Sequence, residues 1–202
     1  WSKAFDARNT RPTPFTRSDG SRVDVPMMWR ESSYPIARTS DVVAVELPYA
    51  DSAYSIVLVM PAQGTALSAA ESYLTDAKWE ALLALLHTNE VLLGVPKFHI
   101  EYSVELNDIL KNLGMGVAFE PNVADFTRIS TRDDMYISRV FQKAFIDVNE
   151  EGTEAAAATG VGMGVTSAPM PLAYDRPFLF AIRERSTGTI LFAGRVTDPS
   201  VR

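Results

Sequence analysis

The feature that most constrains how this chain can fold is a set of short β-rich runs that come in adjacent pairs. Val42–Leu47 and Tyr54–Met60 are dominated by branched and apolar residues, and a short segment with turn character joins them. Phe178–Glu184 and Thr189–Val196 form a second pair, separated by Ser186-Thr187-Gly188. Two strands that are joined by so short a turn lie antiparallel to each other, so each of these pairs predicts a hairpin.

Two helices are predicted, and both stand apart from these pairs. The first covers Ala77–His87, where Trp79 and several leucines recur at helical spacing and form an apolar face. The second is expected to begin at a Ser103 cap and to run through Leu113, with Gly114 ending it.

The remaining segments decide the fold class. Val91–Ile100 and Tyr136–Val148 have strand character, whereas residues 8–22 are rich in Arg, Thr, Pro, Ser and Gly and are expected to form a loop or an irregular crossing. Strands dominate, the helices are segregated, and no regular βαβ alternation occurs, so the sequence predicts an α+β fold. No linker is visible that would divide the chain into two domains.

The composition excludes several classes of function. With 202 residues, 47% of them hydrophobic, the chain can bury a sizeable core. The net charge is −6 without a run of Lys or Arg, so neither nucleic acid nor a heparin-like polyanion is expected as the main partner. No apolar run reaches the roughly 20 residues of a membrane span. The absence of cysteine excludes disulfides and thiol chemistry but leaves the compartment open. Because the chain begins at Trp1 rather than Met, a preceding segment is expected.

No motif of an enzyme or of a metal site is convincing. His87 and His99 have no metal-ligand spacing and are expected to be structural, and there is no G-x-S-x-G nucleophile motif. Asp133 and Asp134 are adjacent, so on a strand their side chains face opposite ways. Gly160–Gly164 lacks both the last glycine of a dinucleotide-binding motif and the Lys-Ser/Thr of a P-loop. The chain is therefore predicted to be no enzyme and to need no cofactor and no metal.

The segment from Glu150 to Ser167 has contradictory local preferences. Thr153–Ala158 could form a capped helical turn, but so short a helix is marginal on its own. With a period of two, one face is uncharged and becomes apolar toward its end, while the other face carries the only charge and all the glycines. That pattern suits a strand that slides between two existing strands with one face buried. A plain flexible Ala/Gly linker is the alternative, and the residues alone leave both open.

Several motifs in this order resemble the C-terminal half of a serpin, a family of protease inhibitors. The sequence E-E-G-T-E-A-A-A-A-T from Glu150 is similar to the loop hinge of inhibitory serpins, and Trp1, Phe5, Thr10 and Phe15 are spaced as in the stretch after the family's third strand of sheet A. Further matches are V-x-V-P-M-M at Val23–Met28, Pro96-Lys97-Phe98, Asp175–Phe178, and Phe192–Val196 with Asp198-Pro199. The resemblance implies that residues 1–202 are the C-terminal part of a single serpin domain, without its N-terminal helices and sheet A strands, and with the reactive-centre loop at about 150–175.

The resemblance also assigns roles to residues of this sequence. The family's spacing, counted from Gly152, puts the reactive bond between Thr166 and Ser167, with Met163 as the alternative. Trp1, Lys97, Glu150 and Gln142 occupy the breach and shutter positions, where Lys97 and Glu150 are expected to pair and Gln142 stands where many members have a histidine. The loop hinge comprises Gly152, Thr153, Glu154, Ala155, Ala156, Ala157, Ala158 and Thr159.

The function that this implies is suicide-substrate inhibition of a serine protease, with loop cleavage followed by insertion into sheet A. Because Thr166 is small, an elastase-like or subtilisin-like target is expected, and the target protease is the expected partner through a covalent acyl complex. The alternative is a non-inhibitory serpin that acts as a chaperone, carrier or storage protein, but the small, uncharged residues on the inserting face of the hinge favour inhibition. The full-length protein is expected to be a monomer in an extracellular or periplasmic location rather than in the cytoplasm.

Overall fold

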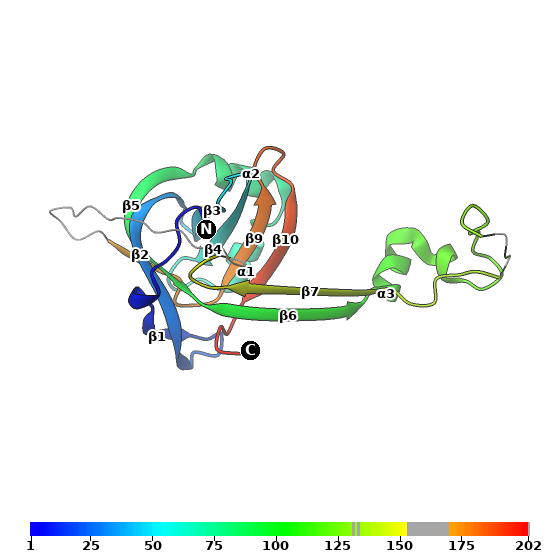
Figure 1. Ribbon diagram of the computed structural model, residues 1–202, viewed down its shortest axis with the longest axis horizontal. Helices are drawn as coiled ribbons and strands as arrows, with labels where there is room; N and C mark the ends of the chain where they lie inside the picture. The colour runs from blue at the N-terminus through cyan, green and yellow to red at the C-terminus, as the bar shows by residue number, and fades with distance from the viewer. Residues whose placement is uncertain (131, 133, 153–169, 202) are drawn as a thin grey trace. The chain divides into compact units, whose positions relative to one another are not determined.

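The computed structural model describes residues 1–130, 132, 134–152 and 170–201 (Figure 1). The chain divides into two compact units, one formed by Trp1–His99 with Asp147–Arg202 and the other by Ile100–Ile146. The α+β fold class is confirmed, since strands dominate and the helices are short and few among these residues. The strands are β1 (Arg11–Thr16), β2 (Arg22–Arg38), β3 (Val42–Pro48), β4 (Tyr54–Pro61), β5 (His87–Pro96), β6 (Phe98–Glu105), β7 (Phe141–Val148), β8 (Pro171–Ala173), β9 (Phe178–Glu184) and β10 (Ile190–Val196).

The first unit is built on one sheet whose strands follow the order β10-β9-β4-β3-β2-β5-β8, with β1 also paired to β2 (Figure 1). The long strand β2 connects the two halves of this sheet. It pairs with β5 from Met27 to Ile36 and then with β3 from Ile36 to Arg38. Because a strand of 17 residues can pair with different neighbours along its length, a single chain segment ties the two halves together.

Both predicted hairpins are confirmed. β3 and β4 pair antiparallel from Val42–Pro61 to Pro48–Ser55, and β9 pairs with both β4 and β10. The turn before β10 is the predicted one, because Gly188 has a φ of 75°, a conformation that favours glycine.

The prediction of a loop over residues 8–22 was wrong. A short helix, η1 (Ala7–Asn9), is followed by β1, which pairs antiparallel with β2. The prolines misled the sequence analysis, because proline is compatible with a strand that pairs on one side, and β1 has β2 as its pairing partner among the described residues. Phe15 on this strand is fully buried, which explains why the segment is held in place.

The predicted strand Val91–Ile100 is two strands of different sheets. β5 ends at Pro96, β6 begins at Phe98, and the backbone N–H of Lys97 donates to the carbonyl oxygen of Pro26 (2.9 Å). Proline lacks an N–H to continue a ladder, so the pairing of β5 can end at Pro96. Lys97 therefore lies at the junction between the two sheets.

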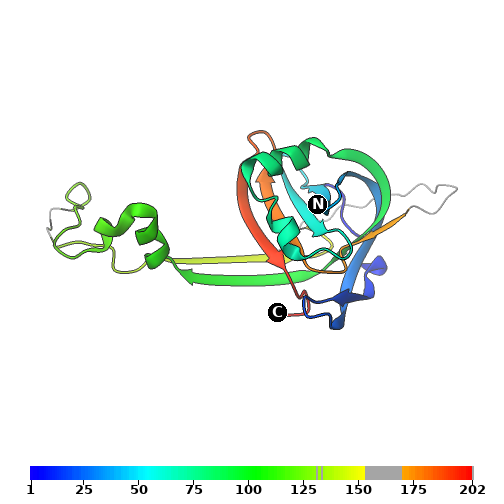
Figure 2. The same ribbon diagram turned by 180° about the vertical axis from the view of Figure 1, so that it is seen from behind.

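One face of the sheet is covered by α1 (Leu67–Glu71) and α2 (Asp76–Ala84), as Figure 2 shows. Trp79 and Leu82 of α2 pack against small and branched residues of the strands. The predicted end of the helix was wrong, since Leu85 is half-exposed in a turn and His87 is the first residue of β5. The pairing of His87 with Ile36 of β2 is a tertiary contact that the helical spacing of the leucines does not reveal.

The second unit, Ile100–Ile146, contains most of β6 and β7, which pair with each other, and the helical turns α3 (Asn107–Leu110), η2 (Lys111–Met115) and η3 (Gly116–Phe119). Ser103 lies within β6 and caps no helix, so that prediction was wrong. The chain continues as a strand to Glu105, after which the Leu106 N–H donates to the Val140 carbonyl (2.8 Å). The glycine stop is confirmed at Gly114, where φ is 96°.

The strand predicted from Tyr136 is shorter than expected, because β7 begins only at Phe141. Residues before it bond elsewhere, with the Ile137 N–H donating to the carbonyl of Ala118 (2.9 Å). In the part of the chain that the structure describes, no helix is long and apolar enough to cross a membrane.

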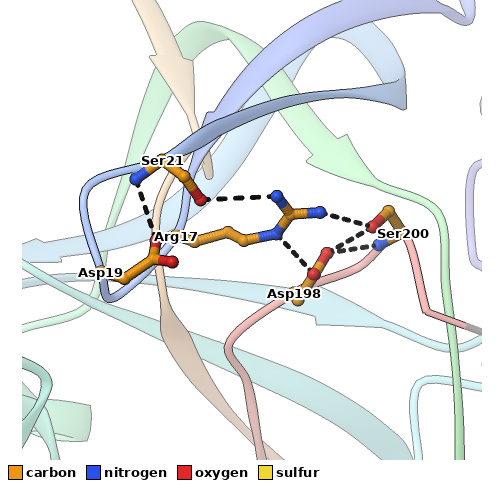
Figure 3. A network of polar contacts seen from close by, with 5 residues as sticks. All are labelled: Arg17, Asp19, Ser21, Asp198 and Ser200. Atoms are coloured by element: carbon orange, nitrogen blue, oxygen red, sulfur yellow. Dashed lines mark hydrogen bonds and ion pairs between the residues drawn. The ribbon is translucent and has the colours of Figure 1, made fainter.

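The turn between β1 and β2 is held to the residues that follow β10 (Figure 3). Arg17 donates through Nε to Asp198 Oδ2 (2.5 Å) and through Nη2 to Ser200 Oγ (3.2 Å), and it also reaches Ser21 Oγ (3.4 Å). Asp198 in turn accepts from the Ser200 N–H (2.9 Å). Two segments far apart in the sequence are thus joined by one guanidinium, whose planar donors suit several acceptors at once.

A buried ionic cluster joins β3, β4 and β9. Glu46 is 3% exposed, and its Oε1 accepts from Ser55 Oγ (2.7 Å) and from Arg183 Nη2 (2.7 Å), with Arg185 Nε at 3.4 Å. Burial opposes ionisation of this carboxyl, but the hydrogen bonds from Ser55 and Arg183 outweigh it and hold the pKa of Glu46 below its usual value. The three strands therefore share one buried charged contact.

Removing this carboxylate should destabilise the intact protein strongly. Glu46→Ala leaves Arg183 without its buried counter-charge, which costs about 3–5 kcal/mol. We expect the midpoint of urea unfolding, followed by tryptophan fluorescence, to fall markedly. Glu90→Ala, at an exposed position of β5, should change the free energy of unfolding by less than about 0.5 kcal/mol. Equal midpoints for the two variants would contradict the role of the cluster.

Candidate functional site: the hinge at the end of β7

The chain leaves β7 through a tight turn formed by Asn149–Gly152. The Asn149 N–H donates to the Gly152 carbonyl (3.1 Å), and the Gly152 N–H donates to the Asn149 carbonyl (3.3 Å). The side chain of Asn149 accepts from the Glu151 N–H through Oδ1 (2.9 Å), a local contact typical of Asn in turns. The turn is therefore closed by both backbone and side-chain bonds just before the predicted loop.

Trp1 holds this turn from the other side. Its backbone nitrogen donates to the Glu151 carbonyl (2.8 Å), and its indole Nε1 donates to the Asn149 carbonyl (2.9 Å). Gly152 is buried against it with φ at 142°, and a β-carbon added there would lie 2.7 Å from the Trp1 nitrogen. Both the backbone angle and the close approach therefore require glycine.

Aromatic contacts fix Trp1 itself. Its ring stacks on Tyr49 with centroids 5.2 Å apart and planes 7° from parallel, and it meets Phe5 edge-on at 6.4 Å. Phe5 in turn lies under the guanidinium of Arg30, 4.7 Å from the ring centroid, in a cation–π contact. Trp1 is 8% exposed, so it is a buried anchor rather than a surface residue.

Glu150 is the polar centre of this region. Its Oε2 accepts from Lys97 Nζ (2.7 Å), its Oε1 accepts from Thr10 Oγ1 (2.7 Å), and its backbone carbonyl accepts from the Phe5 N–H (2.8 Å). The side chain of Glu150 is 14% exposed and that of Lys97 is 38% exposed. Glu150 therefore joins the end of β7 to the junction of β5 and β6 and to the segment before β1.

The protonation of Glu150 matters for this junction. Partial burial opposes ionisation, but the hydrogen bonds from Lys97 and Thr10 outweigh it, so the pKa of Glu150 lies below its usual value. A carboxyl with a lowered pKa stabilises the folded state at pH values above its unfolded pKa. That contribution is lost as the pH falls through the folded pKa, on the acid side of the range of about 4–5 in which Glu ordinarily titrates.

The far end of the same loop is also held by the first unit. β8 pairs parallel with β5 through Leu92–Pro171, Leu93–Leu172 and Gly94–Ala173. Tyr174, which follows, is fully buried and donates its hydroxyl to the Leu58 carbonyl (3.0 Å). The residues on both sides of the segment 153–169 are therefore fixed to one compact unit.

The structure brings together four of the residues predicted from the sequence, namely Gly152 of the hinge and Trp1, Lys97 and Glu150 of the breach and shutter positions. Gln142 lies near the start of β7 in the second unit, with its side chain exposed, so it does not belong to this cluster. Outside the described residues lie the predicted reactive-bond residues Thr166 and Ser167, the alternative Met163, and the predicted hinge residues Thr153, Glu154, Ala155, Ala156, Ala157, Ala158 and Thr159.

Sequence reasoning missed three members of the cluster. Thr10, Tyr49 and Asn149 contact Glu150, Trp1 and Gly152, respectively, from three separate parts of the chain. Asn149 carried a detectable signal, since an Asn three residues before a glycine at the end of a strand indicates a turn. Thr10 is among the residues that carry the serpin resemblance, but no local pattern indicates its contact with Glu150 or that of Tyr49 with Trp1, because both contacts depend on tertiary structure.

Comparison with known proteins identifies the fold. The family described as Serpin (serine protease inhibitor) matches residues 1–199. The chain belongs to the serpin family. It is 37% identical to plasminogen activator inhibitor 1 of Sus scrofa, over 98% of this chain and 51% of that protein, and 36% identical to the serine protease inhibitor of Cyanea capillata, over 99% of this chain and 54% of that protein.

Solved serpin structures agree with this assignment. The native form of protease nexin-1, crystallised with heparin, superimposes with a TM-score of 0.84 at 30% identity and covers 98% of this chain. The same match covers 54% of the nexin chain, so the present chain spans about half the length of the serpins it matches. The predicted serpin fold is confirmed.

Reversing the charge of Glu150 should open this part of the intact serpin. Glu150→Lys removes two hydrogen bonds and puts a second cation beside Lys97, at a cost between about 1 kcal/mol for an exposed pair and 3–5 kcal/mol for a buried one. We expect polymers on a native gel after mild heating. Glu151→Lys makes the same change at an exposed neighbour and should leave the protein monomeric. A monomeric Glu150→Lys protein with unchanged heat resistance would show that the pair is unimportant.

Proposed function

We propose that the intact protein is a suicide-substrate inhibitor of serine proteases and that residues 150–175 are its reactive-centre loop. The observation that carries this proposal is the anchoring of both ends of the loop on one compact unit, at the Trp1–Gly152 contact and at β8. Family membership supports it, because the relatives include proteins named as a plasminogen activator inhibitor and a serine protease inhibitor.

The chemistry of inhibition is supplied by the protease. The serine hydroxyl of the protease attacks the carbonyl carbon of Thr166, the amide bond to Ser167 breaks, and the amine of Ser167 leaves with a proton. The product is an ester between Thr166 and the protease serine. No group of this chain acts as an acid, base or nucleophile in that step, which agrees with a protein that is not an enzyme.

Cleavage then frees the hinge to become a strand. Because one face of the hinge, formed by Thr153, Ala155, Ala157 and Thr159, is small and uncharged, it can enter between two strands of sheet A, one of which is β7. The trapped protease is carried along before water can hydrolyse the ester. The drive for insertion comes from relaxation of a native sheet that is stable kinetically rather than at equilibrium.

The identity of the loop residues narrows the class of protease that is expected as the target. Thr166 is small and β-branched, and no Lys or Arg lies between Gly152 and Asp175, so a protease with a small primary pocket fits better than a trypsin-like one. An elastase-like or subtilisin-like enzyme has this property. We propose that the intact inhibitor is a monomer and that it meets this enzyme in an extracellular or periplasmic compartment.

The position of the reactive bond can be tested directly. When an elastase-like protease is mixed with the intact protein, mass spectrometry of the released C-terminal fragment should show that it begins at Ser167. A fragment beginning at Gly164 would indicate the alternative cut after Met163, as expected for a chymotrypsin-like protease. A cut outside Val161–Ala168 would overturn the assignment of the reactive bond.

Insertion itself can be separated from cleavage by changing the first hinge residue. Thr153→Arg would force an unpaired charge into the sheet, which is strongly unfavourable, while the loop stays accessible to the protease. On an SDS gel, the unchanged protein should give a covalent complex and the variant mainly cleaved product. Thr153→Ser should behave like the unchanged protein. Equal complex formation by the Arg variant would refute insertion as the mechanism.

A further inference from the structure

We propose that Asn149 is a positioning residue, which sets the direction in which the loop leaves β7, and that the pair of Asp147 and His99 orients its side-chain amide. The proposal rests on the proposed function insofar as the loop direction is taken to control insertion. The contacts that carry it join residues of the first unit.

Asn149 uses nearly all of its hydrogen-bonding capacity on this turn. Its backbone carbonyl accepts from the Trp1 indole (2.9 Å) and from the Gly152 N–H (3.3 Å), and its own N–H donates to the Gly152 carbonyl (3.1 Å). Its Oδ1 accepts from the Glu151 N–H (2.9 Å), and its Nδ2 donates to Asp147 Oδ1 (3.3 Å). The two atoms of the side-chain amide therefore connect the last residues of β7 to the turn.

The turn needs a neighbouring side chain to fix its conformation, because Gly152 by itself can adopt many conformations. Glycine populates positive φ values as readily as negative ones, so the observed φ of 142° is not fixed by Gly152 itself. The conformation is fixed by neighbours, and the side chain of Asn149 reaches the middle of the turn through the Glu151 N–H. Without that bond, the close fit of Gly152 to Trp1 would be one of several arrangements.

The amide of Asn149 is itself oriented by a charged partner. Asp147 Oδ1 accepts from Nδ2, so the oxygen of the amide must point to the turn, and Asp147 Oδ2 lies 3.3 Å from His99 Nδ1. The two side chains of this pair are 46% and 30% exposed, respectively. His99 therefore contacts the carboxyl oxygen of Asp147 that Asn149 does not use.

Other charged groups lie near this pair in the chain. Lys97, just before β6, and Glu101, within β6, lie two residues to either side of His99. The end of β7 contributes Asp147, and the turn contributes Glu150, which Lys97 already engages.

The experiment measures how firmly Trp1 is bound to the turn, and it does not depend on protease inhibition. In the intact protein, hydrogen exchange of the Trp1 indole N–H is followed by NMR and expressed as a protection factor, so that the intrinsic pH dependence of exchange is removed. Asn149→Ala keeps the backbone carbonyl that Trp1 binds but loses both side-chain bonds, and we expect protection to fall about five- to tenfold, as for a loss of about one net hydrogen bond. Asn89→Ala deletes the same side chain on β5 and should leave protection unchanged.

A second variant separates positioning from general destabilisation. Asn149→Asp is nearly the same size and keeps an acceptor for the Glu151 N–H, but it places a second carboxylate beside Asp147. We expect reduced Trp1 protection although the Glu151 N–H keeps an acceptor. His99→Ala, which removes the side chain beside Asp147 Oδ2, should also lower Trp1 protection, whereas His87→Ala should not.

The consequence for inhibition is measured in parallel. In Asn149→Ala, the amount of inhibitor consumed per trapped protease should rise severalfold, while the rate of loop cleavage stays within about twofold. Unchanged Trp1 protection in both Asn149 variants would overturn the positioning role. If the unchanged protein forms no covalent complex with any protease, the proposed function fails, but the protection factors still decide whether Asn149 positions the turn.

Discussion

The carboxylate of Glu150 lies where three separate parts of the chain meet, and it ties the turn Asn149–Gly152 to the other two. Its two oxygens bind Lys97 and Thr10, and its backbone carbonyl binds Phe5. A buried or half-buried carboxylate is stable only when its acceptor sites are filled, and here the two partners come from the junction of β5 and β6 and from the segment before β1. The charge therefore specifies which chain segments must be adjacent.

Aromatic contacts lie beside this polar centre. Trp1 stacks on Tyr49 and meets Phe5, so the N-terminal residue of the chain is packed between the β3–β4 turn and the segment leading to β1. Its two hydrogen bonds to the carbonyls of Glu151 and Asn149 then align the turn with this packed group. The aromatic packing holds the Trp1 side chain in place, and the hydrogen bonds from Trp1 orient the turn.

The sheet of the first unit explains why both ends of the loop are fixed although the loop itself is long. Along its length, β2 pairs first with β5 and then with β3. Because β5 also carries β8, and because Lys97 follows β5 directly, the residues on both sides of the segment 153–169 are attached to the same strand system.

Much of this architecture could be predicted from the sequence because its signals are local. The β3–β4 and β9–β10 hairpins follow from short turns between β-rich runs, the stop at Gly114 follows from the freedom of glycine at positive φ, and the family motifs are contiguous in the chain. The errors occurred where a local signal was overruled by a distant partner. The prolines of β1 indicated a loop, yet pairing with β2 and burial of Phe15 make a strand, and Ser103 had the character of a helix cap but is held in the ladder of β6.

The sequence alone determined the α+β class, the hairpins, the family resemblance and the hinge pattern that begins at Gly152, because each of these depends on neighbouring residues or on a contiguous motif. Only the tertiary structure decided that Thr10, Tyr49 and Asn149 belong to the same site as Trp1 and Glu150. Their contacts join positions far apart in the chain, since Trp1 is 48 residues from Tyr49 and 148 from Asn149, and Thr10 is 140 residues from Glu150. Such contacts leave no periodicity in the chain, since they arise only when the packing of the sheet and the aromatic residues has brought those segments together.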